Sequence, residues 1–191
     1  MLYSGIRAIL KLILVLFFRL KAVGNDKIIS GGAILAANHK SNWDPLAIWA
    51  TCPRQLSFMA KSELFKFKPF GALLKALGVF PVNRGKGDIS AIKTSLSILK
   101  SDNAMMMFPE GKRILDGTRG EAKAGVAMLA HRAQVPVVPI KICGKFRLFG
   151  KITVIYGEPV SFEEYYGEKL TSEKMQELSE LVMDKVYSLD E

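Results

Sequence analysis

The sequence predicts an α/β fold: a single domain in which a mixed β-sheet is flanked by helices. Short apolar runs followed by polar residues recur along the chain, at residues 33–37, 56–60, 78–84 and 105–107. Segments with apolar residues at helical spacing lie among them, at residues 89–99 and 126–130. Strands that alternate with helices are typical of this layered architecture. The 191 residues contain no linker, repeat or low-complexity segment, which indicates one domain.

The first candidate functional residues follow the apolar run at residues 33–37. His39 and Asp44 stand five positions apart there, and a histidine beside a carboxylate can take a proton from a hydroxyl group. The same fragment also fits an ordinary helix start, with Asp44 as the N-cap and Pro45 at the first helical position. The fragment by itself leaves both interpretations open.

Two further polar clusters follow predicted strands. Arg84 ends the second cluster, and Glu110, Gly111, Lys112 and Arg113 form the third. Ligands of open α/β sheets bind beyond the carboxyl ends of the strands, so we expect these residues to share one rim with His39. Arginine side chains suit phosphate oxygens, and a glycine lets the backbone approach a ligand. The sequence therefore predicts one site that combines a base with a phosphate cradle.

Several other classes of site are disfavoured. No Gly-x-Ser-x-Gly sequence marks the nucleophile of a serine hydrolase. The glycines at 144 and 150 are spaced wrongly for a phosphate loop. Two histidines and the scattered Cys52 and Cys143 show no metal-ligand spacing. We expect no metal and no bound cofactor, and the two cysteines indicate reduced thiols in a cytoplasmic setting.

Four blocks in order, at residues 38–44, 78–84, 108–113 and 135–140, carry a family resemblance. They resemble the glycerolipid acyltransferase family, specifically the 1-acyl-sn-glycerol-3-phosphate acyltransferases. The resemblance covers residues 33–144 and implies the fold of that family. It also implies acyl transfer from acyl-CoA or acyl carrier protein to the sn-2 hydroxyl of 1-acyl-sn-glycerol 3-phosphate, which forms phosphatidic acid in phospholipid biosynthesis.

The resemblance also assigns roles to residues. His39 is expected to be the general base, and Asp44 to hold its ring. The expected acceptor-binding residues are Lys61, Arg84, Glu110, Gly111 and Arg113, and the Gly111 backbone N–H is a candidate donor to the thioester oxygen. Lys112 departs from the family, which usually has threonine or serine there, so the head group of the acceptor stays open. The alternatives are another lysolipid or glycerol 3-phosphate as acceptor, or a non-catalytic lipid-binding relative.

The N-terminal segment predicts membrane contact. Residues 2–23 are mostly apolar, with basic side chains on one side of a helical wheel. The uncharged run at residues 12–18 is far shorter than the ~20 residues of a membrane span. We therefore expect residues 1–24 to form an interfacial helix and residues 25–191 the acyltransferase domain. The alternative is a helix packed in the core of the domain.

The charge distribution agrees with a membrane partner. The net charge is +9, but residues 160–191 hold nine acidic and three basic side chains, a charge of −6, so residues 1–159 carry +15. A basic body suits an anionic bilayer and a phosphorylated lipid. No nucleic-acid-binding motif is present, so nucleic acid is not expected as a partner. We expect the protein at the cytoplasmic face of the cell membrane, bound peripherally or monotopically.

Overall fold

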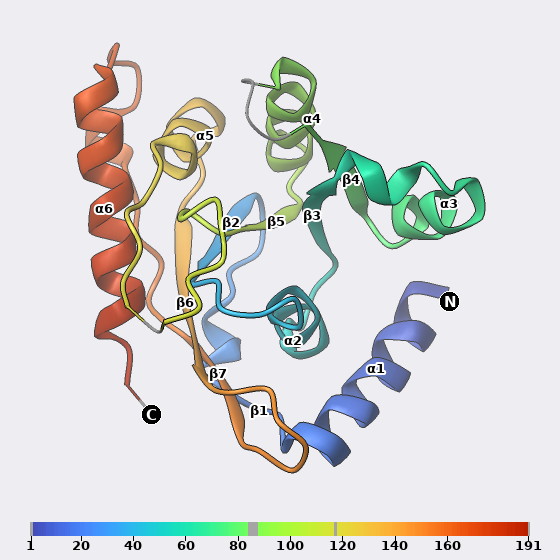
Figure 1. Ribbon diagram of the computed structural model, residues 1–191. Coiled ribbons are helices and arrows are strands. Elements are labelled where there is room, and N and C mark those ends of the chain that lie inside the picture. The colour runs from blue at the N-terminus through green and yellow to red at the C-terminus, as the bar shows by residue number, and fades with distance from the viewer. Residues whose placement is uncertain (1, 84–87, 117, 191) are drawn as a thin grey trace.

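A computed structural model describes residues 2–83, 88–116 and 118–190 and shows a seven-stranded β-sheet between two layers of helices (Figure 1). The strands are β1 (Lys21–Val23), β2 (Ala33–Ala37), β3 (Leu56–Lys61), β4 (Val79–Val82), β5 (Ala104–Met107), β6 (Val137–Gly144) and β7 (Ile152–Tyr156). The helices are α1 (Leu2–Phe18), α2 (Asp44–Thr51), α3 (Lys68–Ala76), α4 (Ile89–Lys100), α5 (Gly125–Ala133) and α6 (Ser172–Ser188). The α/β class with a mixed sheet is confirmed.

The sheet has the strand order β1-β7-β6-β2-β5-β3-β4. Its neighbouring strands are parallel except β6 and β7, which are antiparallel. Strands β2 to β6 therefore all end at one edge of the sheet, here called the carboxyl edge. Binding sites of such sheets form at that edge, and the helices supply the two covering layers.

The central strand β2 is apolar throughout because helices cover both of its faces. Ala33, Leu35 and Ala37 face a core shared with α1 and α2. Ile34 and Ala36 face the other core, shared with α4, α5 and α6. Successive side chains of a strand point to opposite faces, and a strand buried on both faces reads as a continuous apolar run.

Helix α1 is shorter than the segment expected to form the N-terminal helix. It ends at Phe18, and Lys21–Val23 is not helical but pairs with β7 as the edge strand β1. Leu14 is fully buried in the core beside α2, while Leu12 and Leu16 are each 59% exposed. One side of α1 thus packs on the domain, as the core-helix alternative requires, and the other side is an exposed apolar face. In the described part of the chain, no helix is both long enough and apolar enough to cross a bilayer.

Candidate active site

The carboxyl edge brings together the polar clusters identified in the sequence. His39 lies just beyond β2, Lys61 is the last residue of β3, and residues 110–113 follow β5. These strands are parallel neighbours in the sheet. The expectation of one shared rim is confirmed for His39 and residues 110–113, and Lys61 lies at the same edge. Arg84 lies outside the residues that the structure describes.

His39 and Asp44 form a buried pair. The His39 Nδ1 atom lies 3.0 Å from Asp44 Oδ2, and the exposed fractions of the two residues are 8% and 0%. The same oxygen accepts hydrogen bonds from the backbone N–H groups of Lys40 and Ser41, both at 2.6 Å. A carboxylate can only accept a hydrogen bond, so Nδ1 of His39 donates its N–H to Asp44. The other ring nitrogen, Nε2, is then free to accept a proton.

These contacts decide between the two interpretations of Asp44. Helix α2 begins at Asp44 itself, with Pro45 in its first turn. The Asp44 side chain does not cap this helix but turns back to the preceding turn and to the His39 ring. The helix-start interpretation was right about where the helix begins and wrong about the role of the carboxylate.

Asn38 fixes the chain as it leaves β2. Its side-chain amide donates to the Ile142 carbonyl oxygen at 3.2 Å and accepts from the Ile142 N–H at 2.7 Å. The side chain therefore continues the β2–β6 hydrogen-bond pattern by one residue. Because Asn38 directly precedes His39, this pairing helps to fix the position at which the chain leaves the sheet and presents His39.

Glu110 holds the backbone of His39. It is 2% exposed, and its Oε2 accepts from the His39 N–H at 2.8 Å. Its Oε1 accepts from the Gly120 N–H at 3.2 Å and from the Tyr187 hydroxyl at 3.0 Å. Both carboxylate oxygens are thus engaged within the protein, which differs from the acceptor-binding role that the resemblance implied. The contacts support a positioning role for Glu110.

Gly111 adopts a backbone conformation that favours glycine. Its φ is +65°, and a Cβ atom there would lie 3.0 Å from Lys123 Cε. Its N–H donates to the Phe108 carbonyl oxygen at 3.0 Å. The expectation that this N–H is available to a thioester oxygen is therefore wrong in this conformation, because the turn itself uses the donor.

A hollow of about 250 Å³ opens beside His39. Its wall is mainly apolar and comes from Phe58, Met59, Val82, Met106, Met107, Phe108 and Pro109, with Gly111, Lys123 and Gly125. The Phe108 ring stacks on the His39 ring with centroids 4.0 Å apart. Lys123 was not identified from the sequence because it belongs to no recognised block, although the fold places it against Gly111 in this hollow.

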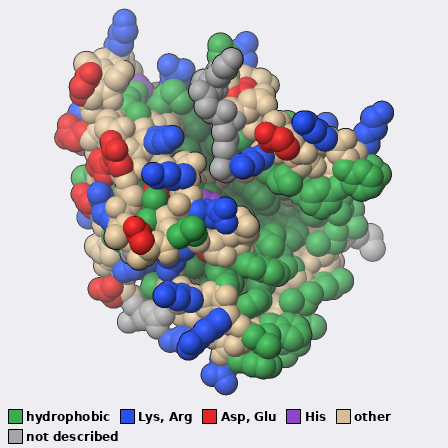
Figure 2. Space-filling view, in the orientation of Figure 1, with side chains coloured by type: hydrophobic (Ala, Val, Ile, Leu, Met, Phe, Trp, Pro, Cys, Tyr) green, Lys and Arg blue, Asp and Glu red, His purple; other side chains and the backbone are tan. Residues whose placement is uncertain are grey.

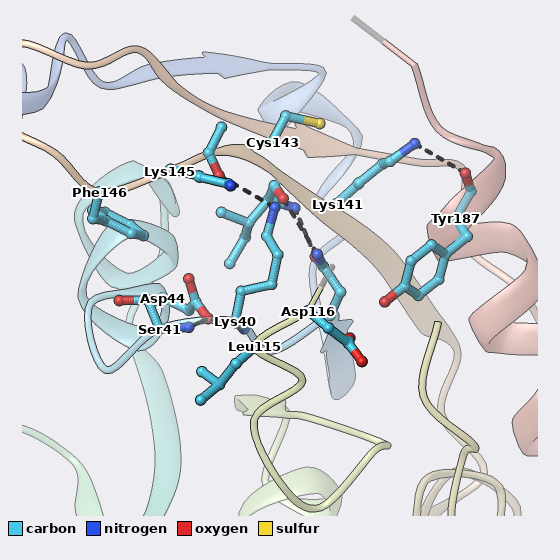
Figure 3. Close-up of a pocket in the computed structure, with 13 residues that line it drawn as sticks. Lys40, Ser41, Asp44, Leu115, Asp116, Lys141, Cys143, Lys145, Phe146 and Tyr187 are labelled. Atoms are coloured by element: carbon cyan, nitrogen blue, oxygen red, sulfur yellow. Dashed lines mark hydrogen bonds between the residues drawn. The ribbon is translucent and has the colours of Figure 1, made fainter. Parts of the chain in front are cut away.

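A second hollow of about 620 Å³ lies on the Asp44 side of the pair (Figure 3). It is lined by Asp44 but not by His39, whereas the apolar hollow is lined by His39 but not by Asp44. Lys40 extends across it from the turn that carries Asp44, and its Nζ donates to the Gly144 carbonyl oxygen at 3.3 Å. The His39–Asp44 pair therefore lies between the apolar hollow, which has one lysine in its wall, and the second hollow, which is lined by three lysines, Lys40, Lys141 and Lys145.

The cations after β5 take different positions. Arg113 is exposed, one residue before Ile114, whose N–H donates to the His39 carbonyl oxygen at 2.8 Å. This bond keeps the segment that carries Arg113 beside His39. Lys112, the residue that departs from the family pattern, lines a third hollow with Arg119 and Gln176 and does not line the hollow beside His39. Among the described residues, His, Cys, Asp and Glu side chains nowhere gather in threes that could hold a metal ion.

A buried histidine–aspartate pair at the carboxyl edge of an α/β sheet, beside cations and an apolar hollow, is an arrangement suited to transfer chemistry on an amphiphilic substrate. Comparison with known proteins gives the class directly: residues 19–143 match the acyltransferase family model. The chain belongs to the acyltransferase family.

Individual relatives show which members of the family this chain resembles. The chain is 33% identical to the 1-acyl-sn-glycerol-3-phosphate acyltransferase of Streptococcus pneumoniae over 165 residues, which is 83% of this chain and 60% of that protein. It is 29% identical to the Bacillus subtilis protein of the same name over 188 residues, 95% of this chain and 93% of the relative. The solved structure of the Thermotoga maritima acyltransferase PlsC matches with a TM-score of 0.75 at 24% identity, covering 99% of this chain and 81% of that chain, and this supports the fold.

Proposed function

We propose that the protein transfers an acyl group from a thioester, acyl-CoA or acyl carrier protein, to the sn-2 hydroxyl of 1-acyl-sn-glycerol 3-phosphate. The product is phosphatidic acid, which places the reaction in phospholipid biosynthesis. The observation that carries this proposal is the buried His39–Asp44 pair, 3.0 Å apart, at the mouth of an apolar hollow. The names of the bacterial relatives support the choice of substrate.

His39 acts as the general base. Its Nε2 removes the proton of the acceptor hydroxyl while the hydroxyl oxygen attacks the thioester carbonyl carbon. The C–O bond forms, the C–S bond breaks, and the departing thiolate takes the proton back from the imidazolium. Asp44 holds the ring and stabilises its charged form. The reaction needs no metal or bound cofactor, because the acyl carrier arrives as a substrate.

The phosphate of the acceptor binds to cations at the carboxyl edge. Lys61, Arg84 and Arg113 keep this proposed role, and we add Lys123, which lines the hollow together with His39. Gly111 contributes by leaving room for the Lys123 side chain, which a Cβ at this position would crowd. Anchoring the phosphate turns the encounter of hydroxyl and thioester into an oriented one. The apolar hollow then has the chemistry to receive an acyl chain.

The enzyme works at the membrane surface. The exposed apolar face of α1, with Leu12 and Leu16, lies among the head groups on the cytoplasmic side. In this proposal the N-terminal segment up to residue 24 is the membrane-binding element, and residues 25–191 form the catalytic domain, although β1 belongs to the sheet.

The test is an assay of the purified protein with a panel of acceptors and both acyl carriers. We expect lysophosphatidic acid to be acylated faster than lysophosphatidylcholine or monoacylglycerol, which lack an accessible phosphate monoester, and faster than glycerol 3-phosphate, which lacks an acyl chain. Preference for an acceptor without phosphate would contradict the assignment of the cations. No turnover with any acceptor, from protein that binds lysophosphatidic acid, would favour a non-catalytic lipid-binding relative.

A further inference from the structure

Helix α3 and the residue before it expose large apolar side chains that no other described part of the domain covers. Within α3, only Gly71 is buried, and it packs closely on the backbone of Phe65. The exposed fractions of Phe67, Phe70 and Leu73 are 69%, 42% and 37%. Burial of an apolar face normally stabilises a short helix, because isolated helices of this length are marginal in water. The outer face of α3 therefore lacks the apolar partner that such a helix requires.

A second exposed apolar segment is the loop between β6 and β7, residues 145–151. Leu148 and Phe149 at its tip are 64% and 62% exposed. The loop is attached to α1, because the Phe149 N–H donates to the Phe17 carbonyl oxygen at 2.7 Å. Phe146, at the base of the loop, lies against Phe18 with ring centroids 5.6 Å apart. The loop thus extends the exposed face of α1.

These segments share one side of the molecule with the active site. The β6–β7 loop leaves β6, and α3 with its preceding turn leaves β3, both at the carboxyl edge. The last turn of α1 reaches the same edge through Phe18, which contacts Trp43 beside Asp44. Figure 2 shows hydrophobic side chains forming a continuous band over α3, α1 and the loop below, with basic side chains at its borders. The band is called here the docking surface.

The charge of the docking surface specifies its partner. Residues 2–23, 61–76 and 145–151 hold eleven basic side chains and one acidic side chain. Helix α6 holds four acidic and two basic side chains and lies on the opposite side of the sheet from α1 (Figure 1). Apolar side chains ringed by lysine and arginine suit a bilayer of anionic lipids, in which the apolar groups enter the head-group region.

We infer that α3 and the β6–β7 loop are membrane-docking elements that act together with α1 and hold the carboxyl edge against an anionic bilayer. This inference deepens the proposed function, since contacts made by three elements fix an orientation that one helix alone leaves free. In that orientation the lysolipid reaches Lys61 and His39 without leaving the membrane surface.

The experiment compares two double variants and one single-substitution control, all made in the full chain. Phe67→Ser/Phe70→Ser alters α3, Leu148→Ser/Phe149→Ser alters the loop, and Leu181→Ser, 43% exposed on α6, is the control. Binding is measured by co-sedimentation with phosphatidylglycerol vesicles and with phosphatidylcholine vesicles, and folding by circular dichroism. We expect each double variant to lose about tenfold or more in affinity for phosphatidylglycerol vesicles. The control should bind like the wild type, and wild-type binding should be weaker on phosphatidylcholine.

Activity on a short-chain lysophosphatidic acid that stays monomeric in solution should be unchanged in both double variants. Wild-type vesicle affinity in both would overturn the inference, and so would a self-association of the wild type that the α3 variant abolishes, because a second copy would then cover α3. Failure of the proposed function gives a different result: no product from any acceptor, with the expected pattern of vesicle binding intact.

Discussion

His39, the proposed base, is held through its ring and through its backbone. Asp44 fixes the ring, Glu110 accepts from the His39 N–H, and Ile114 donates to the His39 carbonyl oxygen. The segment after β5 thus holds the backbone of His39 on both its N–H and its carbonyl group. Supporting groups of this kind matter because a small displacement of a reacting group lowers the rate strongly.

Tyr187 completes this support from α6 and provides the first prediction. Burial, and then the nearby Glu110 carboxylate, raise the pKa of the Tyr187 phenol, which is therefore a neutral donor throughout the working range. Tyr187→Phe should lower kcat about three- to tenfold, because a hydrogen bond to a charged group is lost, and should leave both KM values nearly unchanged. The ratio to wild type should stay constant from about pH 6 to pH 9, since the raised pKa keeps the phenol protonated there.

The control for this prediction is Tyr166→Phe, since Tyr166 lies beside His131, away from the site. A kcat of Tyr187→Phe equal to that of the control would remove Tyr187 from the support of His39. A ratio that changes with pH would show that the phenol titrates in the working range.

Arg113 provides a prediction about the acceptor. Arg113→Ala should raise the KM for lysophosphatidic acid about tenfold or more, because an arginine–phosphate contact is charge-assisted, and should hardly change the KM for the acyl thioester. Steady-state kinetics with both substrates varied measure the two constants. Arg132→Ala, an exposed arginine on α5, is the control. Equal effects on both KM values would place Arg113 outside the acceptor site.

Residue types near the strand ends predicted His39 and Asp44 but not the use of Glu110. The spacing in the sequence shows that Glu110 is near His39 once the strands pair, and it gives no information on which way the carboxylate points. That direction depends on Gly120 and Tyr187, which are ten and 77 positions away from Glu110 in the chain. Lys123 was missed for the same reason, because a loop return brings it to Gly111.

At the scale of elements, one face of α1 packs in the core of the domain and the other face is exposed. Leu14 is fully buried, whereas Leu12 is 59% exposed two residues earlier. Leu14→Ala should lower the free energy of unfolding by about 2–5 kcal/mol, the range for buried leucines, and Leu12→Ala should lower it by less than about 0.5 kcal/mol. Urea denaturation of the two variants measures both values. Similar losses would mean that the two faces of α1 are not distinguished as described.

Because one face of α1 packs on the domain, its membrane role cannot be tested by deleting the helix. Deleting residues 2–23 would remove Leu14 from the core and β1 from the sheet. We therefore do not expect the chain without residues 2–23 to fold. Substitutions on the exposed face separate membrane binding from folding.

Elements marked by an apolar run or by a helical period were predicted, whereas β1 and α3 carry neither mark and were missed. The segments at 33–37, 89–99 and 126–130 became β2, α4 and α5. Strand β1 has three residues, which is too short for a period to show, and it exists because β7 pairs with it. Helix α3 was missed because its apolar residues are mostly exposed, so they do not mark a core-facing stripe.

At the scale of the whole molecule, the fold places His39, the cations and the apolar surface at one edge of one sheet. In the proposed function, both substrates meet at this edge. A covalent route would require an activated nucleophile. The Ser41 hydroxyl accepts from the Trp43 N–H within its own turn, and burial raises the pKa of the Cys52 thiol, which keeps it unreactive. The arrangement favours direct transfer.

Direct transfer predicts that the enzyme stays unmodified when the acceptor is withheld. Incubation with acyl-CoA alone, followed by intact-mass measurement, should give the unmodified mass. Initial-rate plots with both substrates varied should intersect. A stoichiometric acyl adduct that disappears on adding lysophosphatidic acid would show an acyl-enzyme.

The central claim is that His39 is the base in acyl transfer to a lysophosphatidic acid. The measurement that tests it most directly is the rate of phosphatidic acid formation by the wild type and by His39→Ala at saturating acyl thioester and acceptor. We expect the variant to fold normally, to bind the acceptor nearly as well, and to turn over about 10²–10⁴ times more slowly, the usual contribution of a general base. Turnover within a few-fold of the wild type, from a correctly folded His39→Ala protein, would contradict the claim.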